Sequence, residues 1–233
     1  MQPYFLPYIG YWQLIAAVDK FVILDDVNYI NRGWINRNRI TVNGSPGWMT
    51  LPLQGASQNK LISELDLVLN SDWRSRLGKT VRHAYSKAPN FEFAFALFDE
   101  LLEQAQGNLS SFLVTTIKRL CSVFGIATEI LPTSRVFQKN GLTGAERLVD
   151  ICRQLGATAY VNPPGGKELY DSQPFNAAAI DLYFLSPQIA DLDLCFGSRE
   201  GASLSILDLL MHNSAEAVAR CILTNQTIEQ KSA

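Results

Sequence analysis

The sequence predicts an α/β fold in which a mostly parallel, Rossmann-like sheet is flanked by helices. Short apolar runs alternate with amphipathic stretches of about 10–15 residues, the pattern of repeated strand–helix units. The run 21–24 is apolar throughout and is followed by two aspartates. This pattern is typical of a strand that is buried on both faces and leads into a loop. The 233 residues are 47% hydrophobic and 18% charged, so we expect residues 1–233 to form a single domain.

The order of the elements follows from apolar periodicity and turn residues. Strands are predicted over residues 21–24, 34–42, 48–53, 127–131, 159–161 and 180–185. Helices are predicted over residues 11–18, 72–87, 91–106, 109–124, 143–156, 173–179 and 203–223. Residues 224–233 are polar and are expected to fray. The helices within residues 72–124 follow one another without strands, which predicts a helical lobe beside the sheet.

An inserted β-hairpin is predicted in the first third of the chain. Asn43-Gly44 separates the strand-like runs 34–42 and 48–53. This dipeptide favours the type I′ turn, whose twist matches that of paired strands.

Charge and cysteine content restrict the function classes. Net charge is −2, yet residues 1–90 hold ten Lys or Arg against six Asp or Glu, and residues 91–233 hold ten against sixteen. This balance favours a small anionic ligand and argues against a nucleic acid partner. The four cysteines form no CxxC pair, so we expect free thiols in apolar packing and a reducing compartment. With neither a signal-peptide pattern nor a membrane-spanning apolar run, the prediction is a cytoplasmic protein.

The opening segment is the first candidate for ligand binding. Two prolines and a glycine fix a loop that enters a helix, where free backbone N–H groups can hold an anion. Its candidate substrate-binding residues are Gln2, Tyr4, Tyr8, Gly10 and Tyr11. The alternative is an aromatic plug of the core, with Gly10 at a tight packing contact.

A second candidate is the stretch 31–39, which holds three arginines, three asparagines and no acid. On a strand, Arg37 and Arg39 would share one face, and Asn36 and Asn38 the other. Two guanidinium groups on one face, with Arg32 just before them, suit a phosphate or carboxylate. The alternative is the solvated face of an edge strand.

Asp25 and Asp26 are the candidate catalytic residues. They follow a buried strand, and the carboxyl ends of parallel strands border the ligand crevice in such sheets. One of them could act as a general base or hold a Mg²⁺ ion near a diphosphate, although the chain does not specify a metal. Alternatively, one caps a turn while the other pairs with Arg32 or Arg37.

Two later segments complete the candidate site. Gly165 and Gly166, followed by Tyr170, form a loop after a strand and could approach a sugar or phosphate closely. Ser205 and Asp208 share a face of the last predicted helix, where helix capping is the simpler explanation.

Three blocks of the chain closely resemble the WbqC-like family. They are the segment from Gln2 to Arg39, the run Asn162-Pro-Pro-Gly-Gly-Lys-Glu-Leu-Tyr170, and Ser205-Ile-Leu-Asp208. The resemblance implies a role in glycan or nucleotide-sugar modification, since members often lie in bacterial gene clusters for O-antigen and other surface polysaccharides. Family members usually carry a short apolar strand before Gln-Pro. Here Met1 stands there, so either the start codon is assigned late or that strand is absent.

A more distant resemblance concerns mechanism. Tyr8-Ile-Gly-Tyr11 before a helix is similar to the start of the HIGH-motif nucleotidylyltransferases, which place His-x-Gly-His there. Tyrosine donates a hydrogen bond but carries no positive charge. We therefore expect this chain to share the loop geometry of these enzymes more than their nucleotidyl-transfer activity.

These features together favour a transferase that acts on an activated sugar or a nucleotide-linked intermediate in surface-polysaccharide biosynthesis. The alternative is a non-catalytic module that binds a sugar nucleotide or phosphate. The two differ in whether an acid or base converges with the arginines in one pocket. A structural interaction protein would instead expose an apolar patch on the helices within residues 91–124.

Overall fold

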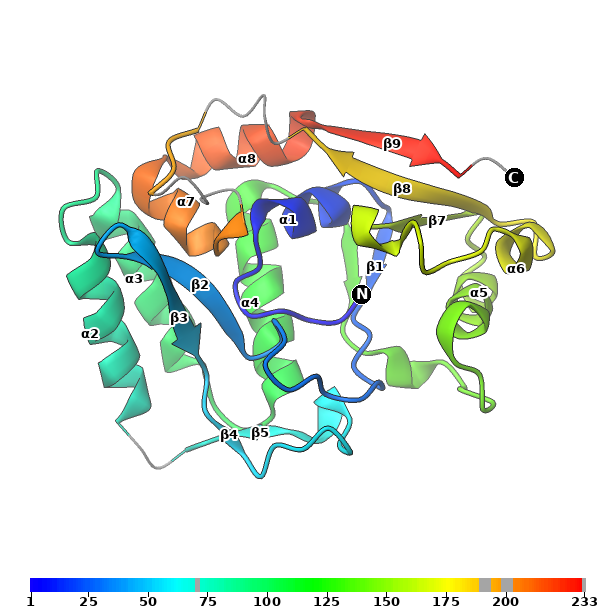
Figure 1. The fold of residues 1–233 in the computed structure, drawn as a ribbon, viewed down its shortest axis with the longest axis horizontal. Coiled ribbons are helices and arrows are strands. Elements are labelled where there is room, and N and C mark those ends of the chain that lie inside the picture. Colours follow the sequence, from blue (N-terminus) through cyan, green and yellow to red (C-terminus); the bar gives the residue numbers. More distant parts are fainter. Residues whose placement is uncertain (70–71, 189–193, 198–202, 232–233) are drawn as a thin grey trace.

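The structure is a computed structural model that describes residues 1–69, 72–188, 194–197 and 203–231 (Figure 1). It is a mixed α/β fold, as the sequence predicts. Its α-helices are α1 (Ile9–Ala16), α2 (Trp73–Tyr85), α3 (Phe91–Glu103), α4 (Leu109–Phe124), α5 (Gly144–Gln154), α6 (Gln173–Asn176), α7 (Ile206–His212) and α8 (Ala215–Thr224). Its strands are β1 (Lys20–Val22), β2 (Arg37–Val42), β3 (Ser45–Thr50), β4 (Leu53–Gln54), β5 (Asp66–Leu67), β6 (Glu129–Leu131), β7 (Ala159–Asn162), β8 (Asp181–Pro187) and β9 (Gln226–Gln230).

The predicted single parallel sheet is not found among the described strands. β1 and β6 form one parallel pair, and β7 and β8 form another, to which β9 adds in antiparallel orientation. The remaining strands form the antiparallel pairs β2–β3 and β4–β5. The strand–helix alternation therefore predicts the parallel pairs, but not their separation into different sheets.

The inserted hairpin is confirmed. β2 pairs with β3 in the register Val42↔Ser45, and the turn residues Asn43 and Gly44 have φ values of 51° and 75°. Both lie in the left-handed region that the type I′ turn requires and that asparagine and glycine adopt most readily.

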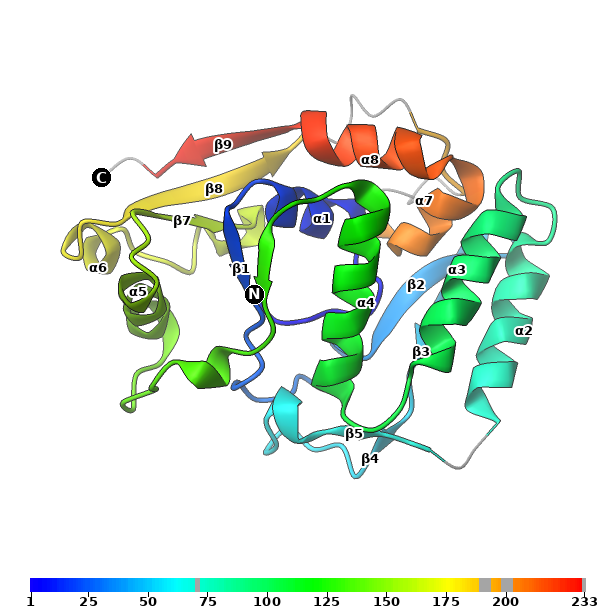
Figure 2. The ribbon, with the colours of Figure 1, turned by 180° about the vertical axis from the view of Figure 1, so that it is seen from behind.

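The helices predicted within residues 72–124 form as α2, α3 and α4. α2 packs on α3, whereas α4 packs against α8 and the 3-10 turn η1 (Ile62–Glu64). Figure 2 shows α4 crossing the back of the molecule between β1 and α3. Asn108 caps the start of α4 by accepting from Ser111 N, and Gly125 ends the helix at φ 66°. α4 thus belongs to the main core.

The last third of the chain corrects two predictions. Residues 203–223 do not form one helix: α7 ends at His212, and Ser214 begins α8 by accepting a hydrogen bond from Ala217 N. The polar residues 226–230 do not fray but pair with β8. Residues 198–202, 232 and 233 lie outside the described part of the chain.

Two hydrophobic clusters hold the fold together. The large one joins the opening loop, α1, α3, α4, α7 and α8, and includes Trp12, Phe98 and Phe124. A small one packs α5 and α6 on β7 and β8 and includes Phe175 and Phe184. None of the described helices is both long and apolar enough to cross a membrane.

All four cysteines are free, as predicted, but they differ in exposure. Cys121, Cys152 and Cys221 are buried, and burial raises the pKa of the Cys121 thiol to about 12. Cys195 is exposed, which corrects the expectation that all four pack in apolar surroundings.

Candidate functional site

The opening loop is held in place by two buried polar side chains. Leu6 adopts φ 44°, which is unusual for a residue with a branched side chain. Asn38 Nδ2 donates to Phe5 O at 3.0 Å and to Leu6 O at 2.8 Å, and Ser205 Oγ donates to Leu6 O at 2.8 Å. Ser205 N donates in turn to Arg39 O. The loop, β2 and the start of α7 are therefore locked together.

Replacing Asn38 by alanine should loosen this loop. Two buried carbonyl groups would lose their donor, so we expect the free energy of unfolding to fall by about 1–3 kcal/mol. Chemical denaturation measures the loss, and Asn59→Ala, at an exposed loop position, is the control. Equal midpoints for the two variants would contradict the assigned lock.

The aromatic residues of the opening loop divide between core and surface. Tyr11 is buried, its hydroxyl donates to Gln2 O at 2.9 Å, and it packs against Tyr4. A Cβ at Gly10 would lie 2.5 Å from the Tyr8 ring, so Gly10 serves close packing. Tyr4 and Tyr8 are half-buried, and burial raises the pKa of both, so their phenols stay neutral hydrogen-bond donors.

The two faces of β2 carry different side chains, as predicted. Asn36 and Asn38 are buried, whereas Arg37 and Arg39 lie on the more accessible face. Asn36 accepts from Tyr29 Oη and donates to Leu51 O, which makes it part of the internal packing.

On the accessible face, the two arginines lie over two tryptophans. The Arg37 guanidinium carbon is 3.9 Å from the centroid of the Trp48 ring, and that of Arg39 is 5.8 Å from Trp34. The two indole rings are 5.5 Å apart and tilted by 36°. They are 39% and 49% exposed, for Trp34 and Trp48 respectively. Large apolar rings left this open often mark a binding surface.

Each arginine is also held by hydrogen bonds. Arg37 donates from Nε to Gly33 O at 3.1 Å and from Nη2 to Arg32 O. Arg32 itself is exposed at φ 60° and contributes its carbonyl group to this contact. Arg39 Nη2 donates to Ser203 Oγ at 3.1 Å. The guanidinium groups are thereby fixed in position before any ligand arrives.

We call the surface made by Tyr4, Tyr8, Trp34, Arg37, Arg39 and Trp48 the arginine–aromatic face. A cavity of about 180 Å³ opens on it, lined by Tyr4, Pro7, Tyr8, Trp34, Asn38, Arg39 and Ser203. Since ligand pockets usually measure about 300–1,000 Å³, it suits one end of a ligand, such as a sugar ring or a phosphate. Aromatic rings stack on sugar or base rings, and a guanidinium group pairs with an anion.

Asp25 and Asp26 lie elsewhere, in a buried network with η2 (Ser134–Val136) and α5. Asp25 accepts from Ser110 Oγ at 2.9 Å and Thr133 Oγ1 at 2.7 Å, and the Arg135 Nε is 3.8 Å away. Asp26 accepts from Ser134 Oγ at 2.5 Å.

The ion pair of Asp26 is with Arg147 Nη2, at 3.1 Å. Arg147, and not Arg32 or Arg37, is therefore its partner, which corrects the expected pairing. The carboxylate oxygens of both aspartates are engaged by donors of the chain itself. Among the described residues, no cluster of three or more His, Cys, Asp or Glu side chains could hold a metal ion.

Asp208 forms a third polar centre, buried beside the hairpin. Its carboxylate accepts from Tyr85 Oη at 2.5 Å, Thr41 N at 3.3 Å and Gly197 N at 3.2 Å. Burial, and then the Asp208 charge, raises the pKa of Tyr85, which keeps its hydroxyl a donor. A Cβ at Gly197 would lie 2.8 Å from Asp208 Oδ1, so only glycine approaches so closely. Asp208 thus ties β2, α2 and α7 together.

The double-glycine loop stands apart from the arginine–aromatic face. Gly165 and Gly166 lie in η3 (Pro164–Gly166) at the end of β7, where a Cβ on Gly166 would clash with the Asn162 amide. Tyr170 packs edge-on against Phe175 of the small cluster. None of the three lines the 180 Å³ cavity. The structure therefore brings the opening loop and the stretch 31–39 together on one face, and the double-glycine loop lies apart from them.

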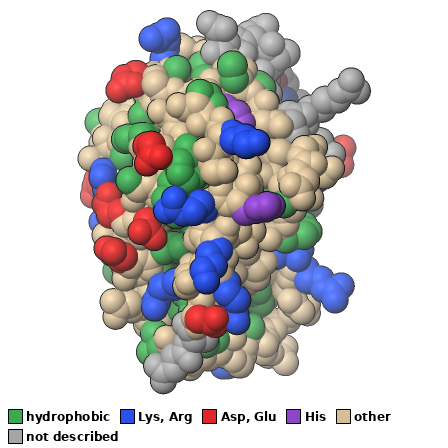
Figure 3. Space-filling model, turned by 90° about the vertical axis from the view of Figure 1, so that its left-hand side faces the viewer, with side chains coloured by type: hydrophobic (Ala, Val, Ile, Leu, Met, Phe, Trp, Pro, Cys, Tyr) green, Lys and Arg blue, Asp and Glu red, His purple; other side chains and the backbone are tan. Residues whose placement is uncertain are grey.

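Figure 3 shows the side of the molecule where α2 and α3 lie, on which Lys and Arg side chains stand beside a group of Asp and Glu side chains. The basic residues of α2 include Arg74, Arg76, Lys79 and Arg82. Arg82 lies 4.3 Å from the Phe95 ring of α3, an arginine–aromatic contact outside the candidate site.

Sequence reasoning missed the two tryptophans and Ser203 as site residues. Register was the available signal: Trp48 pairs directly with Arg39 across the hairpin. Once the turn at Asn43-Gly44 is recognised, this register places the Trp48 ring on the same face as Arg37 and Arg39, within reach of its diagonal neighbour Arg37, which it contacts.

The fold and the site thus define a mixed α/β protein with a preformed cationic and aromatic surface. The model of the WbqC-like protein family matches residues 2–220, and the chain belongs to this family. A relative from Mycobacterium tuberculosis, the uncharacterized protein Rv1507c, is 34% identical over 219 residues, covering 93% of this chain and 94% of that protein. No solved structure matches the chain.

Proposed function

We propose that the arginine–aromatic face binds the phosphate-bearing part of an activated sugar, and that the protein serves surface-polysaccharide biosynthesis as a sugar-nucleotide-binding protein. The observation that carries this proposal is the pair of guanidinium groups fixed over Trp34 and Trp48 beside a small cavity. A guanidinium group pairs with the phosphate of a nucleotide-sugar or sugar phosphate, and an aromatic ring stacks on its sugar or base. Family membership supports the polysaccharide setting.

Binding is favoured over transfer because of where the two acids lie. A transferase using Asp25 or Asp26 needs one of them beside the anion-binding arginines. Asp25 instead accepts a hydrogen bond from Ser134 N, and Asp26 accepts one from Ser134 Oγ and forms an ion pair with Arg147. Tyr8 supplies a neutral donor at the cavity, and Tyr11, the second tyrosine of the motif similar to HIGH, points into the core. Turnover of the bound sugar by the purified protein would restore the transferase hypothesis.

Thermal-shift screening tests the proposal directly. A ligand at one hundred times its dissociation constant stabilises a protein by about 2.7 kcal/mol. For a domain of this size, that raises the melting temperature by about 5–10 °C. We expect such a shift with nucleotide-sugars or sugar phosphates, with and without Mg²⁺, and a smaller one with the unphosphorylated sugars.

The variants Arg39→Ala and Arg37→Ala should abolish the shift. The matched control is Arg82→Ala, which removes an arginine from an aromatic contact on α2 and should leave the shift intact. If Arg37→Ala and Arg39→Ala respond to the ligand as fully as Arg82→Ala, the ligand binds elsewhere.

A further inference from the structure

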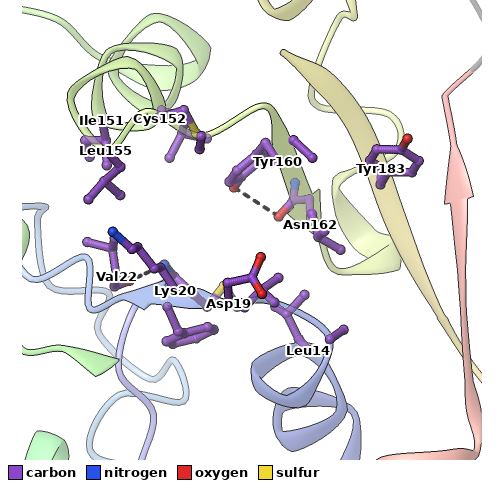
Figure 4. Close-up of a pocket in the computed structure, with 18 of the residues that line it drawn as sticks. Leu14, Asp19, Lys20, Val22, Ile151, Cys152, Leu155, Tyr160, Asn162 and Tyr183 are labelled. Carbon is purple, nitrogen blue, oxygen red and sulfur yellow. Dashed lines mark hydrogen bonds between the residues drawn. The ribbon is translucent and has the colours of Figure 1, made fainter. Parts of the chain in front are cut away.

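A second and larger cavity, of about 620 Å³, lies between β1 on one side and β7 and α5 on the other. Figure 4 shows Lys20 of β1 facing Tyr160 and Asn162 of β7 across it. Its lining is mostly apolar. Tyr160 Oη donates to Asn162 Oδ1 at 3.5 Å, and Lys20 Nζ lies 3.9 Å from Glu129 Oε2. These polar groups find partners within the chain, whereas unpaired charges gather on α2 and α3.

The outer side of α2 carries a row of basic side chains. Arg76, Lys79 and Arg82 are exposed and recur every third residue along the helix, and the exposed Lys87 follows its end. Asp72 is the one acid in the sequence between residues 72 and 87, and it lies 2.9 Å from Arg76. The outer side of α2 is therefore cationic along its whole length.

The outer side of α3 carries an acidic row. Glu92, Asp99 and Glu103 are exposed and, together with Ala96, recur at spacings of three and four residues. Within the described chain, neither Lys79 nor these three acids enter an ion pair. Figure 3 shows the two kinds of charge next to each other on one side of the molecule. The two rows thus stand side by side and remain open to a partner.

Contacts between the two antiparallel helices fix which charges stand at the same height. Arg82, near the end of α2, lies over the ring of Phe95, near the start of α3. Arg74, at the start of α2, donates to Ala105 O, just after the end of α3. Both helices rise equally per residue, so these contacts place Lys79 level with Asp99, near the middle of each helix, and Arg76 level with Glu103.

This arrangement of charge is complementary to itself. A half-turn about an axis parallel to the two helices, midway between them and at their outer surface, places α2 of one copy over α3 of another. The rotation leaves the height of every residue unchanged, so the basic row meets the acidic row, and it does so twice, as in any isologous interface. A half-turn about an axis across the helices would instead place like charges together.

We propose that the outer side of α2 and α3, which we call the α2–α3 face, binds a second copy of this chain in a two-fold symmetric dimer. Lys79 of each copy contacts Asp99 of the other at the centre of the interface, and Arg76 contacts Glu103 toward one end. The half-buried ring of Phe95 and the exposed Ala96 supply apolar contact between the rows.

The size of the α2–α3 face predicts a weak dimer. Helices of 13 residues are about 20 Å long, and two of them packed about 10 Å apart present about 400 Å² on each copy. Interfaces below about 1,200 Å² in total belong to weak and transient complexes. A nucleic acid or an anionic bilayer fits this face less well, because the acids of α3 would repel it beside the cations of α2.

Sedimentation equilibrium of the full chain tests the proposal. At about 50 mM salt we expect a monomer–dimer equilibrium with a dissociation constant of about 0.01–1 mM. Raising the salt to about 500 mM should increase this constant by about tenfold or more, because salt screens exposed charges.

Two charge-reversal variants test the assigned contact. Lys79→Glu and Asp99→Lys should each raise the dissociation constant by about tenfold or more, since each places like charges together at both symmetry-related contacts. An equimolar mixture of the two variants should associate as tightly as the parent. In the mixed dimer, one contact joins Glu to Lys and the other joins the native Lys79 and Asp99.

The matched control is Arg153→Glu, which reverses an exposed charge on α5 and should leave association unchanged. Figure 1 shows α5 at the far end of the molecule from α2. Circular dichroism and melting temperature check that each variant is folded.

Three results would overturn the proposal. One is a parent chain that stays monomeric at about 1 mM protein and low salt. Another is a mixture of Lys79→Glu and Asp99→Lys that associates no better than either variant alone. The third is binding of the monomeric parent to phosphatidylglycerol vesicles that Lys79→Glu abolishes, which would assign the face to a membrane surface. The α2–α3 face shares no residue with the arginine–aromatic face, and at micromolar protein the chain is monomeric, so ligand binding and unfolding are measured independently of the outcome.

Discussion

Replacing Asp26 by alanine is expected to lower the free energy of unfolding by about 3–5 kcal/mol, because it strands a buried cation. The Arg147 side chain is 5% exposed and lies 3.1 Å from the Asp26 carboxylate. It also donates to Gln138 O and Phe137 O, so Arg147 joins the loop before α5 to the loop after β1, which holds Asp26. Loss of the carboxylate leaves the guanidinium group with mostly neutral partners in a low-dielectric setting.

Chemical denaturation measures this loss, and Asp150→Ala is the matched control. Asp150 contacts the same arginine at 3.4 Å but is 24% exposed, so its removal should cost less than about 1 kcal/mol. In the double variant Asp26→Ala/Arg147→Met, the cost should be well below the sum of the two single costs, since no buried charge remains alone. An Asp26→Ala protein as stable as the parent would contradict the contribution assigned to the buried Asp26–Arg147 pair.

Replacing Asp208 by alanine is the second change with a large expected effect. The Tyr85 hydroxyl and the N–H groups of Thr41 and Gly197 would lose a charged acceptor in the interior. Hydrogen bonds to charged groups contribute about 1.5–3 kcal/mol each, so we expect a loss of about 3 kcal/mol or more.

The control for Asp208 is Asp99→Ala, at an exposed position of α3, which should stay within about 0.5 kcal/mol of the parent. Tyr85→Phe should be destabilising alone but should add little on top of Asp208→Ala, because both remove the same bond. Full additivity of the two substitutions would show that the Tyr85–Asp208 contact does not contribute as the geometry indicates.

Local signals predicted the hairpin and α4 correctly. Asn43-Gly44 specifies its turn through backbone conformation alone, and Asn108 and Gly125 specify the two ends of α4 in the same way. These residues act on their own neighbours, so no knowledge of the rest of the chain is needed.

The incorrect predictions depend on contacts between distant segments. The break between α7 and α8 falls at Asn213, whose amide donates to Cys195 O and Leu209 O and whose Oδ1 accepts from Cys195 N. β9 is polar in sequence and owes its strand conformation to pairing with β8. Asp26 finds its partner 121 positions along the chain, in Arg147. Sequence spacing carries no information about such pairs.

Only part of the candidate site could be predicted, because the rest of it depends on contacts between distant segments. Alternation along β2 separates Arg37 and Arg39 from Asn36 and Asn38, which the sequence reveals. That Asn38 and Ser205 lock the opening loop, and that Trp34 lies beside the Arg39 guanidinium group, follows only from the fold. Residue types suggested an anion site, and the structure supplies the rings beside it.

The four indole N–H groups offer the most direct test of ligand binding at the arginine–aromatic face. Trp34 and Trp48 lie on this face, whereas Trp12 and Trp73 are buried and donate to Pro7 O and Val68 O. In an NMR titration with UDP-glucose, the Nε1–H signals of Trp34 and Trp48 should shift in a saturable manner, those of Trp12 and Trp73 should stay in place, and Arg39→Ala should remove the effect. Binding of UDP-glucose that leaves the Trp34 and Trp48 signals unmoved, or no binding by any nucleotide-sugar or sugar phosphate in the thermal-shift screen, would contradict the proposed site.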